Sequence, residues 1–324
     1  MATTSKKPVS KKPKTAKKVS PATAKKTVTK KATKTSVKST KVTAAKSAPV
    51  IKDSTKKMSL KNVVPTQVQK LRTWNISMAV LHAVQAAAVV LLAKAGTGMQ
   101  PVTTSYLTQD SLASTPAQPV LVSATRHLFD VNLVWLIAAF FIMSAIAHAS
   151  IATWYRARYE ANLSKGINKA RWIEYSLSAS TMMVAIGLIA GIFDVSTLVM
   201  MFGLTAVMNL CGLAMELVNQ NRPKVSWIAY IIGCIAGILP WIVYVIYIVG
   251  SSKLGDGNGP PTFVYFILVS IFLAFNSFAY VMLKQYQKKG KWSDYLYGER
   301  AYMVLSLVAK SLLAWQVFAG ILRP

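Results

Sequence analysis

The residue in this sequence with the clearest potential for chemistry is Lys310, which lies in the apolar stretch from Tyr302 to Leu322. That stretch is long enough to cross a bilayer, because about 20 residues at about 1.5 Å each match a hydrocarbon core of roughly 30 Å. A lysine near the middle costs about 2.5–3.5 kcal/mol on insertion scales, so it needs a partner, a water-filled cavity or a chemical role. The amine can form a Schiff base with a carbonyl compound, or it can pair with a buried acid that fixes helix packing.

Three further ionisable side chains, His82, His148 and Glu174, lie inside apolar stretches and toward the same expected membrane face. A carboxylate close to Lys310 would hold the amine in its charged form, and two histidines can accept or share a proton. Glu174 reaches the depth of Lys310 only if its helix begins before the first apolar residue, and Asn168 is a suitable N-cap for such a start. A structural hydrogen bond explains each histidine equally well, and no spacing on one helix predicts a metal site.

Two other polar residues share a helical face with members of this group. Ser306 precedes Lys310 by four residues and Gln85 follows His82 by three, spacings that place each pair on one side of a helix. Glu216 lies near the cytoplasmic end of its apolar stretch, where we expect it to face the lipid headgroups. The sequence therefore predicts a buried amine with polar groups on its cytoplasmic side.

Seven apolar stretches, each long enough to cross a membrane, carry these residues. They are Trp74–Ala95, Leu128–Trp154, Trp172–Phe193, Ser196–Val218, Trp227–Gly250, Phe263–Leu283 and Tyr302–Leu322. The predicted fold is an all-α membrane protein, a bundle of seven transmembrane helices within residues 71–324. The two cysteines, Cys211 and Cys234, both lie inside apolar stretches and predict no disulfide framework.

The basic residues of the connecting segments predict the orientation of the bundle. With the N-terminus in the cytoplasm, the cytoplasmic connections hold 12 lysines and arginines, and the opposite ones hold four, Lys94, Arg126, Lys253 and Arg323. Positive charge in short loops favours the cytoplasmic side. We therefore expect a multi-pass membrane protein with a cytoplasmic N-terminus and an extracellular C-terminus.

The start of the chain is strongly basic. Residues 1–72 hold 21 lysines and arginines against one acid, Asp53, and so contribute +20 of the formal net charge of +28. Residues 1–62 contain no aromatic side chain and no leucine before Leu60, so they cannot form a core. We expect residues 1–70 to be a disordered, Lys-rich cytoplasmic tail. Such a tail can bind anionic lipid or nucleic acid, or it can be a solvated segment that only sets the topology.

The longest connection on the opposite side spans residues 96–127. Its runs VTTSYLT and PVLVSAT are rich in β-branched residues and are separated by turn residues around Asp110 and Pro116. This pattern predicts a small β-hairpin over the outer end of the bundle.

Several tryptophans lie in or beside the apolar stretches. Trp154, Trp172 and Trp227 are near the ends of stretches, where they are expected to anchor the bundle at the membrane interface. Trp241 and Trp315 lie deeper and are candidates for lining a ligand cavity, although aromatic rows also serve ordinary packing.

Six segments of the sequence are similar to the heliorhodopsin family. They are WNISMAVLHAVQ, SAIAHA, GINKARWIEYSLSAS, GCIAGILPWI, FNSFA and LYGERAYMVLSLVAKSLLAWQVFAG. The likeness extends over residues 70–322 and includes all seven apolar stretches in order. Its most specific part is the pairing of RWIEYSLSAS with SLVAKSLLAWQVFAG. Heliorhodopsins are seven-helix retinal proteins with a cytoplasmic N-terminus, which agrees with the charge distribution.

The resemblance implies a light sensor, and not an enzyme, in which Lys310 carries all-trans retinal as a protonated Schiff base. Glu174 would be the counterion, and Ser306 would lie beside the linkage. The implied positions in or near the retinal pocket are Trp172, Tyr175, Pro240, Phe275 and Trp315. The implied proton network on the cytoplasmic side consists of His82 and His148, with Gln85 beside them. The family is generally dimeric, so a homodimer in the lipid bilayer is expected.

Two alternatives remain beside the photoreceptor. A light-gated proton conductor would use the same retinal site, with Glu216, Asp194 and the two histidines as parts of a proton path. A membrane tether without light sensitivity would use the basic tail to hold nucleic acid. The tail departs from the compact family pattern, and the sequence does not identify a signalling partner.

Overall fold

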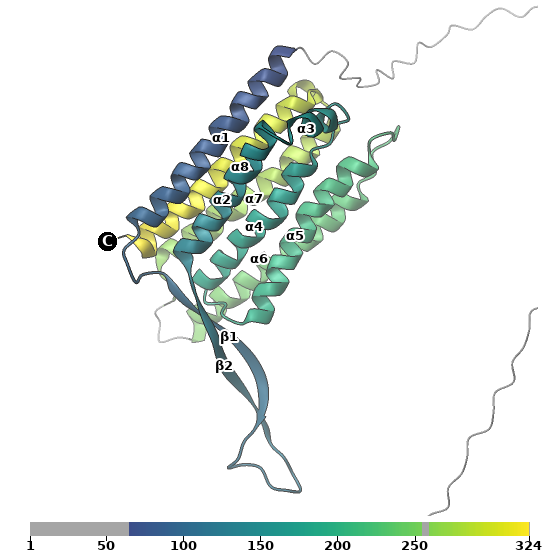
Figure 1. Ribbon diagram of the computed structural model, residues 1–324. Helices are drawn as coiled ribbons and strands as arrows, with labels where there is room; N and C mark the ends of the chain where they lie inside the picture. The colour runs from purple at the N-terminus through teal and green to yellow at the C-terminus, as the bar shows by residue number, and fades with distance from the viewer. Residues whose placement is uncertain (1–64, 255–258, 324) are drawn as a thin grey trace, which may run out of the picture. The chain divides into compact units, whose positions relative to one another are not determined.

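The part of the chain that the computed structural model describes, residues 65–254 and 259–323, is mostly helical (Figure 1). The first helix, α1 (Pro65–Leu92), begins within the segment assigned to the tail, so residues 65–70 are helical. The rest of the predicted tail, residues 1–64, lies outside the described part. The disorder and the binding of nucleic acid or lipid that were predicted for the tail fall on those residues.

Seven helices in the described part of the chain are long and apolar enough to cross a membrane, which confirms the predicted seven-helix membrane fold. They are α1, α2 (Leu133–Ala152), α4 (Lys169–Ile189), α5 (Val195–Val218), α6 (Ile228–Leu254), α7 (Thr262–Gln287) and α8 (Tyr295–Val317). Each predicted stretch overlaps one of these helices. A short helix, α3 (Arg156–Leu163), lies between α2 and α4, a 3₁₀ turn (Gly290–Ser293) precedes α8, and a π-helical turn (Phe318–Leu322) extends it.

Helix α4 begins at Lys169, three residues before the predicted stretch, because Asn168 is its N-cap. The Asn168 side-chain oxygen accepts a hydrogen bond of 3.0 Å from the backbone N–H of Arg171, which confirms the predicted cap. The early start places Glu174 in the second turn of α4.

Helix α8 begins at Tyr295, seven residues before the predicted stretch. The Asp294 carboxylate accepts a hydrogen bond of 2.9 Å from the backbone N–H of Leu296 and so caps the helix. Glu299 and Arg300, which precede the predicted stretch Tyr302–Leu322, therefore belong to the first turns of α8. The search for apolar stretches did not identify this start, because the first turns of α8 carry charged and polar residues.

A two-stranded antiparallel hairpin occupies the connection between α1 and α2. Its strands, β1 (Met99–Gln109) and β2 (Leu121–Asn132), are longer than expected, and α2 begins only at Leu133. Residues 128–132, predicted to start the second spanning helix, are therefore strand. The register shifts between Val102 and Thr103, whose partners are Phe129 and His127, so Leu128 is an extra residue in β2.

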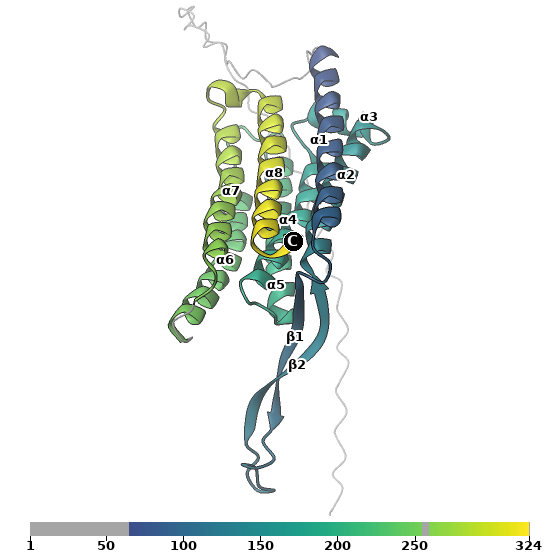
Figure 2. The same cartoon turned by 90° about the vertical axis from the view of Figure 1, so that its left-hand side faces the viewer.

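Asp194 joins the base of the hairpin to the start of α5. Its side chain accepts hydrogen bonds from the backbone N–H groups of Thr197 (2.9 Å) and Ser105 (3.2 Å). The Thr197 hydrogen bond is the main cause that lowers the pKa of Asp194 below its usual value. Asp194 is thus an N-cap and a contact of the hairpin, and the hairpin lies at the end of the bundle opposite to the start of α1 (Figure 2). This position does not support its predicted membership in a proton path with Glu216.

Helix α4 occupies the middle of the bundle (Figure 1) and is the most buried of the seven spanning helices. It packs against α2 and α5, while α1 packs on α2, α6 on α5, and α7 on α8. The main core joins side chains from most of these helices, including Phe140, Met183 and Leu313. The central position of α4 lets a side chain on it reach α2 and α8 together.

Candidate functional site

Lys310 lies on α8 with only 3% of its surface exposed, and it faces α4. Its Nζ atom is 3.2 Å from Oε1 of Glu174 and donates a hydrogen bond of 2.8 Å to Oγ of Ser306. The Nζ atom also lies 5.2 Å from the ring centre of Tyr175, within range of a cation–π interaction. The structure therefore brings together four of the residues that the sequence proposed for the site.

Ser144, on α2, completes the environment of the Glu174 carboxylate and was missed by the sequence analysis. Its Oγ donates a hydrogen bond of 2.5 Å to Oε1 of Glu174, and Ser144 is fully buried. Ser144 precedes His148 by four residues, so the shared helical face was the signal that could have identified it. An ionised carboxylate inside the bundle needs such partners, and Glu174 has both a cation and a hydroxyl.

The two histidines lie side by side between α1 and α2. The rings of His82 and His148 are stacked with their centres 5.8 Å apart. His148 Nδ1 is 2.8 Å from Oδ1 of Asn75. Asn75 is a buried residue on α1, about two helical turns before His82. Neither ring nitrogen of His82 has a hydrogen-bond partner among the described residues. His82 therefore has hydrogen-bonding capacity that no described residue fills.

Gln85 and Trp315 are placed differently from the prediction. Trp315 is 37% exposed, packs on Phe318, and donates a hydrogen bond of 3.2 Å from Nε1 to Oε1 of Gln85. This contact joins α8 to α1 at the surface of the bundle. Among the described residues, Gln85 makes no hydrogen bond to either histidine, and Trp315 lines neither of the cavities described below.

A cavity beside Lys310, here called the lysine cavity, extends from the amine toward α5 and α7. It is lined by Tyr175, Ala179, Met182, Met208, Asn209, Phe275, Phe278, Ser306, Ala309 and Lys310. Most of these side chains are apolar or aromatic. The polar groups gather at the end that holds the amine and at Asn209.

A second cavity, here called the side cavity, continues between α5, α6 and α7. It shares Met208, Asn209, Phe275 and Phe278 with the lysine cavity, and its further lining residues include Trp172 and Trp241. Pro240 is buried next to Trp241 but does not itself line either cavity. The shared residues place the two cavities end to end.

Trp172 does not anchor the bundle at the membrane interface, as was predicted from its position near the end of a stretch. It is buried, and its ring packs against Tyr302 and Tyr175. Gly212 on α5 permits this position, because a Cβ atom there would lie 2.6 Å from Cε3 of Trp172. The early start of α4 explains the error, since it places Trp172 inside the bundle.

Glu216 lies in a different environment from the one predicted. The sequence predicted that it faces lipid headgroups, but it is 3% exposed. Its Oε1 lies 2.5 Å from Nη2 of Arg171, and its other oxygen accepts a hydrogen bond of 2.8 Å from the backbone N–H of Asn168. Arg171 also forms a short ion pair with Glu299 through Nη1. The early starts of α4 and α8 bring these two partners alongside the end of α5.

The Arg171 cluster carries one cation and two carboxylates in the interior. Tyr295 donates a hydrogen bond of 3.1 Å to Glu216, and the Asn168 amide donates one of 2.7 Å to Glu299. The Arg171 guanidinium also stacks over the ring of Tyr302 at 4.1 Å. Buried carboxylates are stable only with such partners, so the cluster ties the ends of α4, α5 and α8 together.

The site fits a long, conjugated aldehyde. A buried lysine amine can form a Schiff base with a carbonyl carbon, and the adjacent carboxylate can balance the positive charge of the product. The apolar and aromatic lysine cavity begins at this amine, and the side cavity adjoins it, so together they suit a hydrocarbon chain. The residues of this chain therefore meet the requirements of retinal.

Comparison with protein families agrees with this chemistry. The model of the family described as Heliorhodopsin matches residues 71–322, which include the seven spanning helices. A search of the curated proteins found no match. Because the family model covers well over half of the chain, this protein belongs to the heliorhodopsin family, whose members are retinal-binding, rhodopsin-type membrane proteins.

Proposed function

We propose that this protein is a light sensor in which all-trans retinal is bound to Lys310 as a protonated Schiff base, with Glu174 as the counterion. The observation that carries the proposal is the buried Lys310–Glu174 pair, 3.2 Å apart, at the end of an apolar cavity. A structural ion pair alone would not need a cavity at the amine. Membership in the heliorhodopsin family supports the same cofactor.

Bound retinal supplies visible absorption and light-driven isomerisation. Glu174 holds the proton and positive charge at the Lys310 nitrogen, and Ser144 and Ser306 keep the two charged groups in place. Tyr175 and Phe275, from α4 and α7, confine the space beside the amine. A shift of the charge away from Glu174 would alter the forces between α4 and α8, and this is the proposed origin of the signal.

The proposed signal leaves the bundle on the side of the two histidines. His148 contacts α1 through Asn75, and a nearby cavity is lined by residues that include His148, Glu174, Arg171 and Glu299. A change at Glu174 therefore has a polar route to the Arg171 cluster at the ends of α4, α5 and α8. With the N-terminus in the cytoplasm, as the charge of the connections favours, this is the cytoplasmic end.

The partners proposed for this function are the lipid bilayer and a second copy of the chain. The homodimer follows from the resemblance to the family, and the basic tail is proposed to contact anionic lipid or nucleic acid. The protein is proposed to act as a receptor and not as an enzyme.

The test is an absorption spectrum of the purified protein with added all-trans retinal, before and after treatment with hydroxylamine in light. We expect a visible band that hydroxylamine bleaches, because this reagent cleaves a retinal Schiff base. A folded protein that stays colourless contradicts the proposal. Colourless protein with tail-dependent, salt-sensitive DNA binding would instead support the membrane tether.

Light-gated proton conduction is the second candidate. It is favoured by the polar groups beside Glu174, because His148 lines a cavity together with Glu174, stacks on His82 and contacts Asn75. Photocurrents from voltage-clamped cells expressing the protein distinguish the two functions. A steady current that reverses with the proton gradient would identify a conductor, whereas the sensor is expected to give no steady current.

A further inference from the structure

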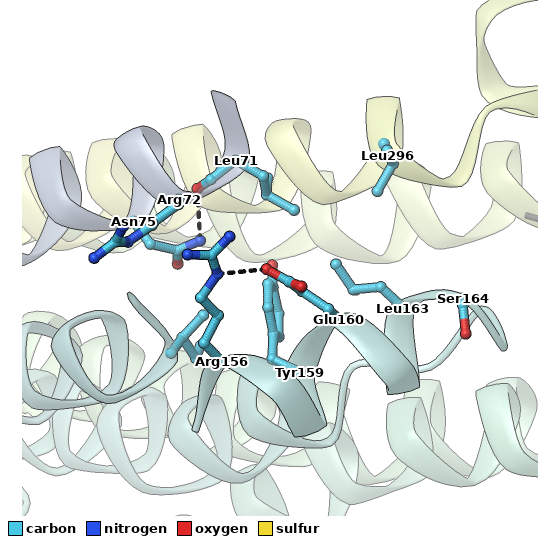
Figure 3. A pocket seen from close by; sticks show the side chains of 10 residues that line it. Leu71, Arg72, Asn75, Arg156, Tyr159, Glu160, Leu163, Ser164 and Leu296 are labelled. Atoms are coloured by element: carbon cyan, nitrogen blue, oxygen red, sulfur yellow. Dashed lines mark hydrogen bonds and ion pairs between the residues drawn. The ribbon is translucent and has the colours of Figure 1, made fainter. Parts of the chain in front are cut away.

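A cavity at the end of the bundle where α1 begins, here called the end cavity, has no assigned role in the proposed function, although Asn75 in its lining contacts His148. It lies between α1, the end of α2, α3 and the start of α8, and Figure 3 shows its side chains. Its apolar lining consists of Leu71, Ile151, Leu163 and Leu296. The cavity measures about 90 Å³, room for several water molecules or a phosphate group.

The charged lining of the end cavity has an excess of positive charge. Arg156 donates a hydrogen bond of 2.6 Å from Nε to Oε1 of Glu160, and Arg72 donates one of 3.2 Å from Nε to the backbone oxygen of Ala152. Two guanidinium groups against one carboxylate leave one positive charge without a charged partner in the cavity. Figure 3 shows the Arg156 guanidinium in the middle of the group, joined to Glu160.

Tyr159, on α3, gives an independent indication of a ligand. Its side chain points from α3 toward α1 (Figure 3), and the residue is 4% exposed. Its hydroxyl makes no hydrogen bond of full geometry among the described residues, and the Asn75 side chain lies close enough to be a weak partner. Burial raises the pKa of Tyr159 well above its usual value, so the hydroxyl stays neutral and can donate. Tyr159 and Asn75 line both the end cavity and the neighbouring cavity beside Glu174, so the hydroxyl keeps hydrogen-bonding capacity that a group bound in the end cavity can use.

The surroundings of the end cavity resemble a membrane interface. Trp154, just before α3, is 79% exposed, as is typical of tryptophans at the level of the headgroups. Lys70, Arg158 and Lys165 lie exposed on the adjoining segments. An apolar wall next to cationic side chains suits a ligand with an anionic group and a hydrocarbon part.

We propose that the end cavity binds the phosphate group of an anionic membrane lipid. Arg72 and Arg156 are the cationic contacts, Tyr159 donates a hydrogen bond to a phosphate oxygen, and the apolar lining contacts the adjoining carbon atoms of the lipid. Guanidinium groups suit this ligand because their planar set of donors matches phosphate oxygens. Free phosphate shares the charged part of this chemistry but gains nothing from the apolar wall.

The test measures lipid retention by the full-length protein, using native mass spectrometry after exchange into mixed phosphatidylglycerol and phosphatidylcholine. The unchanged protein is expected to retain phosphatidylglycerol in preference to phosphatidylcholine. Tyr159→Phe is expected to weaken this retention about tenfold, the scale of one hydrogen bond to a charged group. The variant keeps the ring and removes only a hydroxyl that makes no hydrogen bond of full geometry, so its melting temperature without added lipid should stay close to that of the unchanged protein.

The matched control is the double variant Arg222→Gln/Lys224→Gln, which removes two exposed charges from the connection between α5 and α6. Arg72→Gln/Arg156→Gln removes the same charge from the cavity and is expected to lower retention at least as much as Tyr159→Phe, whereas the control should retain lipid normally. Every variant keeps the basic tail, so the contribution of the tail to lipid retention is the same in all measurements.

Three results would overturn the proposal. Equal retention by the unchanged protein and Tyr159→Phe would assign the lipid to the basic surface. If the unchanged protein retained phosphatidylcholine as well as phosphatidylglycerol, the net charge of the lipid would not contribute to binding. Displacement of phosphatidylglycerol by millimolar inorganic phosphate would identify a free-anion site, whereas no displacement supports the lipid site.

Discussion

Lys310→Ala is expected to abolish the visible absorption band of protein supplied with all-trans retinal. The substitution removes the only amine in the lysine cavity, so no Schiff base can form there. The expected loss is complete, because retinal held without a covalent bond lacks the protonated linkage that shifts absorption into the visible range. The measurement is the ratio of visible to 280 nm absorbance of the purified protein.

Lys310→Arg tests whether lost colour reflects lost chemistry or lost folding. Alanine leaves the Glu174 carboxylate buried without its cation, which can destabilise the bundle. Arginine keeps a positive charge beside Glu174 but offers no amine nucleophile, so it should also be colourless while remaining folded. Lys284→Ala, in the last turn of α7, is the control and should retain full colour. A visible band in either Lys310 variant, at normal intensity, would exclude Lys310 as the attachment site.

Glu174→Gln is expected to shift the visible band strongly to the red. Excitation of a protonated retinal Schiff base moves positive charge away from the nitrogen, so a carboxylate beside the nitrogen stabilises the ground state more than the excited state. At 3.2 Å, two opposite charges in a medium of effective dielectric constant about 20 interact by on the order of 5 kcal/mol. Loss of part of this energy corresponds to a red shift on the order of tens of nanometres.

The Glu174→Gln spectrum is best recorded over a series of pH values, because a linkage without its counterion holds its proton less tightly. The protonated form at low pH is the species to compare with the unchanged protein. Glu160→Gln, the same substitution on α3, removes a carboxylate that pairs with Arg156 and should leave the band in place. An unshifted protonated band in Glu174→Gln would assign the counterion to another group.

Much of the fold was predictable from composition along the chain. Apolar stretches of about 20 residues identify spanning helices because the bilayer excludes unpaired backbone groups. The ends of α4 and α8 were less predictable, because their first turns are polar and are buried only by neighbouring helices. Asn168 as N-cap was predicted for α4, whereas Asp294 was not identified for α8.

The candidate site was predictable where a single side chain was unusual for its surroundings. An amine in hydrocarbon identifies Lys310, and helical spacing adds Ser306. Ser144 and Asn75 gave no such signal, because small polar residues occur in many helices without a special role. Trp315 and Gln85 contact each other at the surface, since the rotation of α1 and α8 about their axes is set by packing.

The sequence by itself determined that seven helices cross the membrane, that a lysine is buried in the last one, and that the residues match the heliorhodopsin family. These properties follow from local hydrophobicity and from the cost of a charge in hydrocarbon. Only the tertiary structure decided that Ser144 donates a hydrogen bond to the Glu174 carboxylate beside the amine and that Glu216 pairs with Arg171 in the interior. Those contacts depend on where each helix begins and how it rotates against its neighbours, which side-chain packing between distant segments decides.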